Sequence, residues 1–188
     1  LLNAVESGHT CRSMMYVPHT EYKKTLQTAA DNCDFEAKYG HLPFGEGVGI
    51  SGGYYISGTS YTLYLSYKPH TVANVKIENE NNVVLFCGTT DIGQGVDMVM
   101  AQMAAETLGI RSEDVKVVSR DTELATFDLG TFASRVTYAS GWAIRRACEA
   151  ANQLLFPVAA AIMGCRGQEV GVKDYQFYSI YEKKRKNV

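Results

Sequence analysis

Residues 83 to 109 read VVLFCGTTDIGQGVDMVMAQMAAETLG, and this stretch decides the fold. Its first five residues, Val83–Cys87, form a continuous apolar run of the length that a buried strand has. After the loop Gly88–Gly95, apolar residues recur every three or four positions from Val96 to Leu108, which is the spacing of one helix face. A glycine follows, where helices commonly end. The sequence therefore predicts a strand, a glycine-rich loop and a helix, in that order.

The residues before this stretch predict a β-hairpin and further strands. Val72–Glu78 alternates apolar and polar residues, as a half-buried strand does, and Asn79–Asn82 is typical of the turn that would join it to the next strand. Farther upstream, Gly45–Tyr67 is rich in glycine, serine, threonine and tyrosine, which suits strands separated by glycine turns. In the polar first 44 residues, apolar residues at helical spacing predict a helix over Glu21–Ala37.

The residues after it predict one more strand and a second long helix. Ser112–Asp114 turns the chain into a strand over Val115–Ser119, and a loop follows from Arg120 to about Arg135. Apolar residues at helical spacing then continue from Ile144 to Ile162. We expect Pro157 to kink or end this helix, because a proline ring clashes with the preceding turn.

The last residues complete the expected fold. Asp174–Tyr181 predicts a strand, and the charge run Glu182–Lys186 is typical of a solvated turn. Together these elements indicate an α+β fold, with a mixed β-sheet and two long helices. We divide the chain into an N-terminal helical segment, residues 1–44, and an α+β domain, residues 45–188.

The composition is that of an ordinary globular protein. The chain has 188 residues, 46% of them hydrophobic, and a net charge of -2 that removes the electrostatic motive for binding nucleic acid. The longest apolar stretches, such as Leu154–Met163, fall short of the roughly 18 residues that a membrane span needs, so we exclude a membrane span. The five cysteines are widely spaced without a C-x-x-C pair. We therefore expect free thiols in a cytoplasmic protein, and no disulfide, zinc or iron–sulfur site in this chain.

Two known sequence motifs are present, but the residues around them do not support a nucleotide-binding site or a serine hydrolase site. Gly47–Gly52 matches the G-x-G-x-x-G dinucleotide pattern, but no strand precedes it, no helix follows it and no acidic residue lies at the required distance. Gly49–Gly53 matches the G-x-S-x-G pattern of α/β-hydrolases, but only His70 lies downstream of Ser51, and no acid lies between them. The remaining histidines stand singly in polar segments, as solvated histidines do: His9, His19 and His41.

The loop Gly88–Gly95 is the first candidate binding segment. It joins the apolar strand to the helix, so its backbone N–H groups and the helix N-terminus can face an anion or a polar heterocycle. Gly93 and Gly95 let a ligand approach the backbone, and the Gln94 amide offers both a donor and an acceptor. The alternative is an ordinary strand-to-helix turn in which Gln94 is a polar cap.

The second candidate is Thr131–Thr137, just before the other long helix. Its hydroxyls and N–H groups would suit a phosphate, as would Arg135 if that side chain points inward. The alternative is simple N-capping of the helix by Ser134 or Thr137. The occurrence of two small-residue loops, each opening a long helix, favours binding over capping.

With these two loops the chain resembles the molybdopterin-binding catalytic subunits of the xanthine dehydrogenase and aldehyde oxidase family of molybdenum hydroxylases. The resemblance extends from about Gly47 to Asn152. Within the family, Gly53–Gly58 and Ser134–Thr137 are most similar to the 4-hydroxybenzoyl-CoA reductase branch. The collinear motifs that carry the resemblance are Gly88–Gly95, Ala101–Ile110, Asp114–Thr122 and Asp128–Thr137.

The resemblance implies the roles of the site residues. Gln94, held between Gly93 and Gly95, would hydrogen-bond the pterin near the metal. Phe132 would wall the substrate pocket. Molybdenum would be held by the dithiolene sulfurs of the pterin, so no protein ligand to the metal is expected. The residues implied to wrap the pterin and its phosphate are Ala133, Ser134, Arg135 and Thr137.

The resemblance also implies an activity, cofactors and partners. The family oxidises or reduces a carbon centre, by hydroxylation or reductive dehydroxylation, in a small aromatic, heterocyclic, aldehyde or acyl-CoA substrate. The implied cofactor is molybdenum–molybdopterin, in the cytosine dinucleotide form. Electrons would be exchanged with Fe–S and FAD groups on partner subunits or domains of a hetero-oligomer.

No catalytic residue is implied within this chain. The glutamate base of the family lies C-terminal to the resembling segment, so we expect a piece of a larger catalytic subunit that is inactive alone. Of the acids near the two loops, Asp91 and Asp97 suit a helix N-terminus, and Asp128 suits loop geometry. The alternative from another class is a non-catalytic binding or assembly module that keeps the fold without the cofactor.

Overall fold

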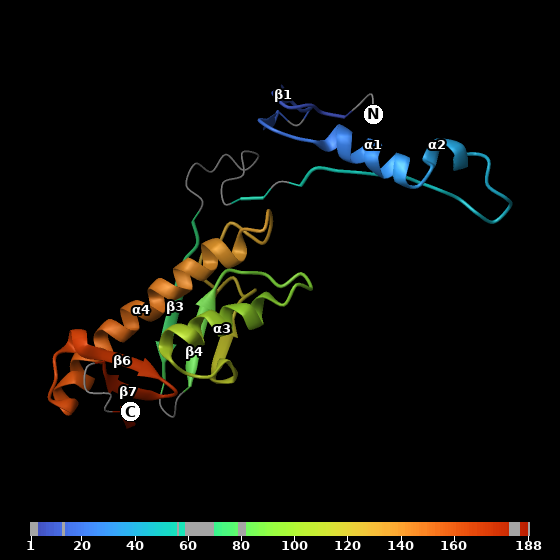
Figure 1. Ribbon diagram of the computed structural model, residues 1–188. Coiled ribbons are helices and arrows are strands. Elements are labelled where there is room, and N and C mark those ends of the chain that lie inside the picture. Colours follow the sequence, from blue (N-terminus) through green and yellow to red (C-terminus); the bar gives the residue numbers. More distant parts are fainter. Residues whose placement is uncertain are drawn as a thin grey trace. The chain divides into compact units, whose positions relative to one another are not determined.

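The computed structural model describes residues 4–12, 14–55, 57–58, 70–78, 82–180 and 185–187. The chain forms two compact units, residues 1–55 and 56–188, and both candidate binding loops belong to the second (Figure 1).

The first unit contains a short hairpin and two helices. Strands β1, His9–Thr10, and β2, Tyr16–Val17, pair antiparallel. Helix α1 spans Tyr22–Asn32 and α2 spans Phe35–Lys38. The prediction of one helix over residues 21–37 is therefore wrong, because Asp34 has a φ of 53°. A right-handed helix cannot continue through that left-handed backbone.

The predicted strands of residues 45–67 are not found where the structure describes the chain. Residues 45–55 and 57–58 contain no strand, and the other residues of that segment lie outside the described residues. The strand prediction from the tyrosine content is therefore wrong for these described residues. The Tyr54 ring instead contacts the Tyr22 ring of α1, with 4.6 Å between ring centroids.

The second unit is built on a sheet in the order β3-β4-β5. Strand β3, Ala73–Ile77, pairs antiparallel with β4, Val83–Cys87, which confirms the predicted hairpin. Its turn, residues 79–81, lies outside the described residues. Strand β5, Val115–Val118, runs parallel to β4 on the other side. A parallel pair needs a crossover, and here the crossover is a helix.

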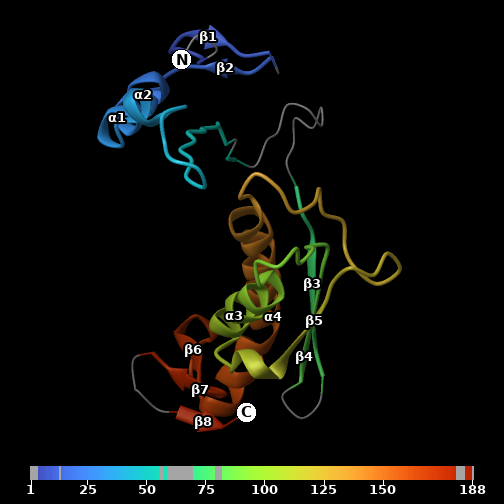
Figure 2. The ribbon, with the colours of Figure 1, turned by 90° about the vertical axis from the view of Figure 1, so that its right-hand side faces the viewer.

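The two predicted long helices cover one face of this sheet (Figure 2). Helix α3, Val96–Leu108, is the crossover, and it ends at Gly109 as predicted. Helix α4 spans Val136–Met163. Alternate residues of β4 point toward the helices and are buried with them, so the continuous apolar run of that strand supplies the centre of the core.

Pro157 does not end α4, which continues for six more residues. A proline inside a helix costs about 3 kcal/mol. The residues just beyond it, Ala159 and Ala160, are buried against Val170 and Phe177. This packing holds the last turns of the helix in place despite the proline.

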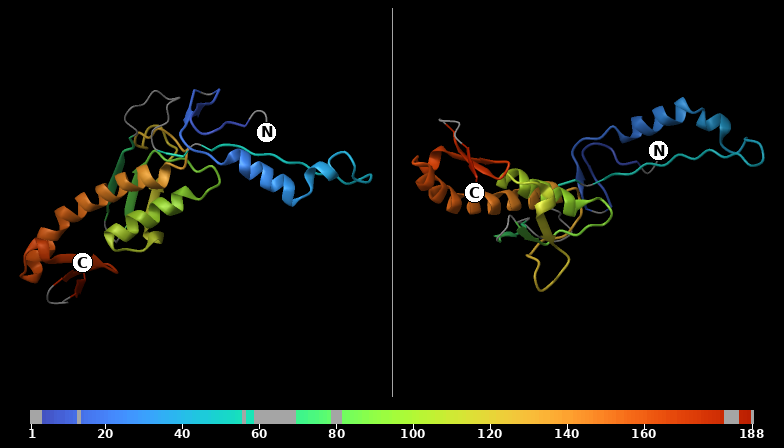
Figure 3. Two further views of the ribbon diagram at one scale, coloured as in Figure 1. Left: turned by 45° about the horizontal axis from the view of Figure 1, so that its top comes forward. Right: turned by 90° about the horizontal axis from the view of Figure 1, so that it is seen from below.

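A second sheet, in the order β6-β7-β8, packs at the C-terminal end of α4 (Figure 3). Its strands are β6, Val170–Lys173, β7, Gln176–Ser179, and β8, Arg185–Asn187. The strand predicted over residues 174–181 is confirmed as the shorter β7, Gln176–Ser179, because Asp174 and Tyr175 have φ values of 52° and 61° and form the hairpin turn that precedes it. Residue 181 lies outside the described residues. The solvated turn predicted at residues 182–186 is wrong for residues 185–186, which pair with β7, and residues 182–184 lie outside the described residues.

The other expectations concern exposure and cysteine pairing. The three singly placed histidines of the first unit are exposed, and no disulfide joins the five cysteines, all of which lie among the described residues. Among the described residues, no helix combines the length and apolar character required to cross a membrane.

Candidate cofactor site

The structure brings the two candidate loops together. The Thr131 hydroxyl of the second loop donates to the Thr90 carbonyl oxygen at 2.8 Å and accepts the Thr90 N–H at 3.1 Å. At Gly88 the backbones pass so closely that an added Cβ would lie 2.7 Å from the Cβ of Asp128. No side chain larger than hydrogen fits there. Two segments about forty residues apart thus form one continuous surface at the N-terminal ends of α3 and α4.

The first loop presents its three predicted residues to solvent. Gly93, Gln94 and Gly95 are all exposed, and Gly95 begins α3 with a φ of 75°. The Gln94 side chain folds onto its own loop, where its Oε1 accepts the Ile92 N–H at 2.6 Å and its Nε2 donates to the Thr90 carbonyl at 3.3 Å. The N-cap residue of α3 is Gly95, and the Gln94 side chain bonds to Thr90 and Ile92 instead of the helix, so the alternative role of Gln94 as a helix cap is wrong.

Carboxylates of the chain itself occupy the N-terminus of α3. The Gly93 N–H donates to Asp91 at 2.8 Å and lowers the pKa of that carboxyl, and further N–H groups of Gly95 and Asp97 act in the same direction. In the first turn, Asp97 accepts hydrogen bonds from Ser119 at 3.0 Å and Arg120 at 2.7 Å. Both acids therefore lie where negative charge is favoured, as expected, and a second anion would be repelled from this helix end.

The second loop ends in an unusual backbone. Ala133 and Ser134 are consecutive residues with φ values of 49° and 55°, a region that side chains other than glycine rarely adopt. Ser134 and Thr137 are exposed, whereas Phe132 and Ala133 are half-buried. The N-cap residue of α4 is Arg135, whose side chain makes no capping hydrogen bond, so neither Ser134 nor Thr137 occupies the N-cap position of the helix.

The first turn of α4 also contains no acid. The N-terminal amides of a helix carry a partial positive charge and attract phosphate. Of the two helix ends at this surface, the end of α4 is therefore the one suited to an anion.

Arg135 points inward, but toward a carboxylate of the chain itself. The side chain is completely buried, and its Nη1 donates to Asp128 at 2.6 Å and to the Gly130 carbonyl at 2.9 Å. Its Nη2 donates to the His70 carbonyl at 3.3 Å. The guanidinium carbon lies 5.6 Å from the centroid of the Phe132 ring. The terminal nitrogens of Arg135 are thus directed beneath the surface rather than toward a ligand.

Asp128 is the partner that compensates this buried charge. Its carboxylate also accepts hydrogen bonds from Ser140 at 2.8 Å, from the Gly130 N–H at 2.8 Å and from the Thr71 hydroxyl. Burial raises the pKa of Asp128, but these hydrogen bonds and that from Arg135 outweigh burial and hold the pKa below its ordinary value. The group is therefore an ionised structural carboxylate, which agrees with the loop role expected for it.

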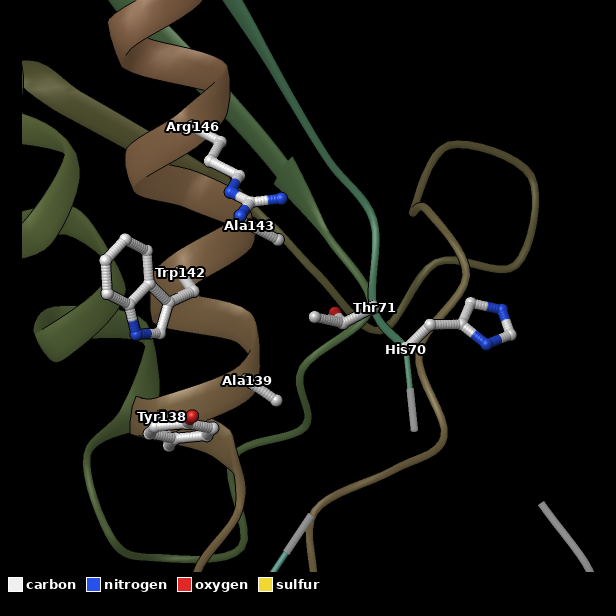
Figure 4. Close-up of a pocket in the computed structure, with 7 residues that line it drawn as sticks. All are labelled: His70, Thr71, Tyr138, Ala139, Trp142, Ala143 and Arg146. Atoms are coloured by element: carbon white, nitrogen blue, oxygen red, sulfur yellow. The ribbon is translucent and has the colours of Figure 1, made fainter. Parts of the chain in front are cut away.

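A groove of about 440 Å³ lies beside the first turns of α4, and the sequence interpretation missed it. Figure 4 shows Tyr138, Trp142 and Arg146 projecting from successive turns of the helix, while His70 lies on the segment that leads into β3. The four-residue spacing of these helical side chains was the available signal. The lining residues are His70, Thr71, Tyr138, Ala139, Trp142, Ala143 and Arg146.

The arrangement fits a polar heterocycle that carries a phosphate. Open space surrounds the backbone of Gly93 and Gly95, so a flat ligand can approach it. The uncapped end of α4 lies on the same surface and suits the phosphate. Within the described residues, no three side chains among His, Cys, Asp and Glu gather closely enough to hold a metal ion.

Comparison with known proteins identifies the family. The model of the molybdopterin cofactor-binding domain matches residues 24–187. The chain is 37% identical over 92 residues to the xanthine dehydrogenase molybdenum-binding subunit of Escherichia coli O157:H7, a match that covers 48% of this chain and 12% of that subunit. It is 30% identical over 105 residues to the nicotine 6-hydroxylase large subunit of Paenarthrobacter nicotinovorans, covering 56% of this chain and 13% of that subunit.

A solved structure supports the same assignment. The crystal structure of a Cu,Mo-CO dehydrogenase matches with a TM-score of 0.60 and 26% sequence identity, over 71% of this chain and 17% of that chain. The chain thus spans about an eighth of the length of the curated relatives it matches. It belongs to the family of molybdopterin cofactor-binding domains, in the group that includes the molybdenum-binding subunits of xanthine dehydrogenase-type oxidoreductases.

Proposed function

We propose that this chain forms part of the cofactor-binding wall in the catalytic subunit of a molybdenum-dependent oxidoreductase. The observation that carries the proposal is the hydrogen-bonded junction of Thr90 with Thr131. It places the exposed loop around Gln94 beside the uncapped N-terminus of α4. We assign the binding function to residues 45–188, which contain both loops.

We assign the predicted residues as follows. The first turn of α4 and the hydroxyls of Ser134 and Thr137 would bind the cofactor phosphate. Gln94 would exchange its bonds to its own loop for bonds to the pterin, and Gly93 and Gly95 would leave room for the ring. Phe132 and Ala133, which are half-buried, would bound the pocket, and Arg135 would support it from beneath. When bound, the molybdenum–pterin group supplies two-electron redox chemistry at a carbon centre.

The finer assignments follow from the family resemblance. We propose the cytosine dinucleotide form of the cofactor, electron transfer to Fe–S and FAD groups on partners, and a small aromatic, heterocyclic, aldehyde or acyl-CoA substrate. The similarity of Gly53–Gly58 and Ser134–Thr137 supports the 4-hydroxybenzoyl-CoA reductase branch. The five cysteines, none of them in a disulfide, support a cytoplasmic location.

The test is to purify the complete subunit that contains this chain, with its native partners. We expect molybdenum and an oxidised pterin derivative in a one-to-one ratio. We also expect oxygen from labelled water to be incorporated into an aromatic or aldehyde substrate, or a labelled acyl-CoA to be reduced. Absence of both molybdenum and pterin from the native protein would contradict the proposal and leave a non-catalytic module.

A further inference from the structure

We propose that Asp128 is a positioning residue: through the buried Arg135 guanidinium it fixes the backbone of Ala133–Ser134. The inference rests on the proposed function, because this backbone belongs to the cofactor-facing loop. Asp128 would not touch the cofactor itself. Its effect would be transmitted by the guanidinium that lies between the carboxylate and the loop.

The first observation is the number of separate segments that Asp128 joins. Its carboxylate accepts hydrogen bonds from Thr71, which precedes β3, from Ser140 of α4 and from the Gly130 N–H of its own loop. Arg135 contributes the fourth donor at 2.6 Å. Because both members of this ion pair have 0% exposed side chains, solvent cannot substitute for either of them.

The second observation is that the Arg135 guanidinium also donates hydrogen bonds to two backbone carbonyls. Arg135 donates to the carbonyl of Gly130 at 2.9 Å and to that of His70 at 3.3 Å. The first bond closes the loop from Gly130 to the start of α4, and the second anchors that closed loop to the segment before β3. A guanidinium fork can satisfy these acceptors and the carboxylate together, which an ammonium cannot.

The third observation is the backbone conformation of the loop that the Arg135 side chain closes. Ala133 and Ser134 both have positive φ and lie within the closed loop. Such backbone persists only where surrounding contacts determine it. Two backbone hydrogen bonds also hold this turn: the Arg135 N–H donates to the Phe132 carbonyl at 3.1 Å, and the Gly58 N–H donates to the Ala133 carbonyl at 2.8 Å. The buried pair adds a side-chain constraint to these backbone bonds, because Arg135 ties the end of the turn to Asp128 and to Gly130.

The fourth observation excludes a direct role of the guanidinium tip. Among the described residues, Arg135 Nε is the buried side-chain nitrogen for which no hydrogen-bond partner is found, and both Nη atoms are directed to Asp128 and the two carbonyls. With its terminal nitrogens bound inside the fold, Arg135 acts on the cofactor-facing surface through backbone geometry.

The test substitutes Asp128→Asn in the complete subunit and measures amide hydrogen exchange in the cofactor-free protein and pterin retention in the holoprotein. Asparagine keeps the size and can still accept hydrogen bonds, but it lacks the charge. We expect exchange at residues 130–136 to rise by at least about tenfold more than exchange in strands β3 to β5, and pterin retention to fall by about tenfold. The matched control is Asp121→Asn, an exposed carboxylate in the same loop that accepts the Glu123 N–H at 2.9 Å. It should change neither quantity.

Unchanged exchange at residues 130–136, or a rise spread evenly over the whole unit, would overturn the inference. A local rise with full pterin retention would also overturn it. If the asparagine variant does not fold, Arg135→Lys serves instead, and it should give a smaller local rise because an ammonium keeps the charge but not the fork. No local rise in that variant would equally reject the inference. Since exchange is measured without cofactor, it decides the backbone role even if the native subunit proves to contain no pterin.

Discussion

The hydroxyl of Thr131 hydrogen-bonds both the amide and the carbonyl of Thr90, at 3.1 and 2.8 Å. One small side chain thus satisfies two backbone groups of a loop that lies 41 residues away in the chain. The contact aligns the two helix N-termini that form the candidate cofactor site. The site is therefore assembled by tertiary contacts, although each loop has its own local signature.

Thr131→Val should separate the two loops. Valine has nearly the same shape but can neither donate nor accept, and each lost hydrogen bond costs about 0.5–1.5 kcal/mol. We expect the free energy of unfolding of the complete subunit to fall by about 1–3 kcal/mol and cofactor retention to fall several-fold. Urea titration and pterin quantification measure the two effects. Thr131→Ser keeps the hydroxyl and should retain both properties, and equal behaviour of the two variants would count against the junction.

Gln94→Ala should lower molybdenum occupancy without unfolding the protein. The side chain is exposed, and its bonds stay within residues 90–94. Its removal should therefore cost less than about 1 kcal/mol of stability. Occupancy, measured by metal analysis, should fall by about tenfold if Gln94 bonds the pterin, a loss equivalent to about 1.4 kcal/mol. Gln102→Ala, an exposed glutamine on α3, is the control. Full occupancy together with full turnover in Gln94→Ala would reject this role.

The double change Ser134→Ala with Thr137→Val should cost cofactor retention far more than stability, and alanine is chosen at position 134 because a β-branched residue would be strained at its φ of 55°. Because Arg135, and neither Ser134 nor Thr137, is the N-cap residue of α4, we expect a stability loss of no more than the roughly 1 kcal/mol that a lost helix cap costs. Pterin content and the thermal midpoint measure the two effects, with exposed Thr122→Val as the control. A lowered midpoint with the cofactor still bound would show that these hydroxyls serve the fold instead.

Much of the fold could be predicted because its signals are local. The apolar run of β4, the helical spacing of α3 and the terminal Gly109 each depend on a few neighbouring residues, and all three predictions are confirmed. The errors arose where distant packing decides. Pro157 stays inside α4 because Ala159 and Ala160 are buried against the second sheet, a contact that no local pattern encodes.

In the candidate site, too, local features could be predicted from the sequence and tertiary contacts could not. Its two loops could be located from glycines, small residues and the helices that follow them. The inward course of Arg135 could not be predicted, because it depends on Thr71 and Ser140, which bind the same carboxylate from other elements. A buried charge is stable only when every partner is in place. Sequence spacing alone therefore left open whether Arg135 meets a phosphate or, as the structure has it, Asp128.

The ion pair of Asp128 with Arg135 should make stability depend on pH in the acid range. The pKa of Asp128 in the folded state lies below its ordinary value of 3.8. A carboxyl with a depressed folded pKa contributes its stability in full above the unfolded pKa and loses it as the pH falls through the folded pKa.

At pH 7, Asp128→Asn should cost about 3–5 kcal/mol, because it leaves the Arg135 charge buried without compensation. Below pH 3.8 the carboxyl binds a proton in the unfolded chain before it does so in the folded protein, so the difference between the two proteins should begin to shrink there and should be lost below the folded pKa. Urea titrations of both proteins between neutral pH and the acid range measure this difference, with Asp121→Asn as the exposed control that should show little at any pH. A stability difference that stays constant as the pH falls would mean that Asp128 acts by shape and hydrogen bonding alone, and that its charge does not hold Arg135.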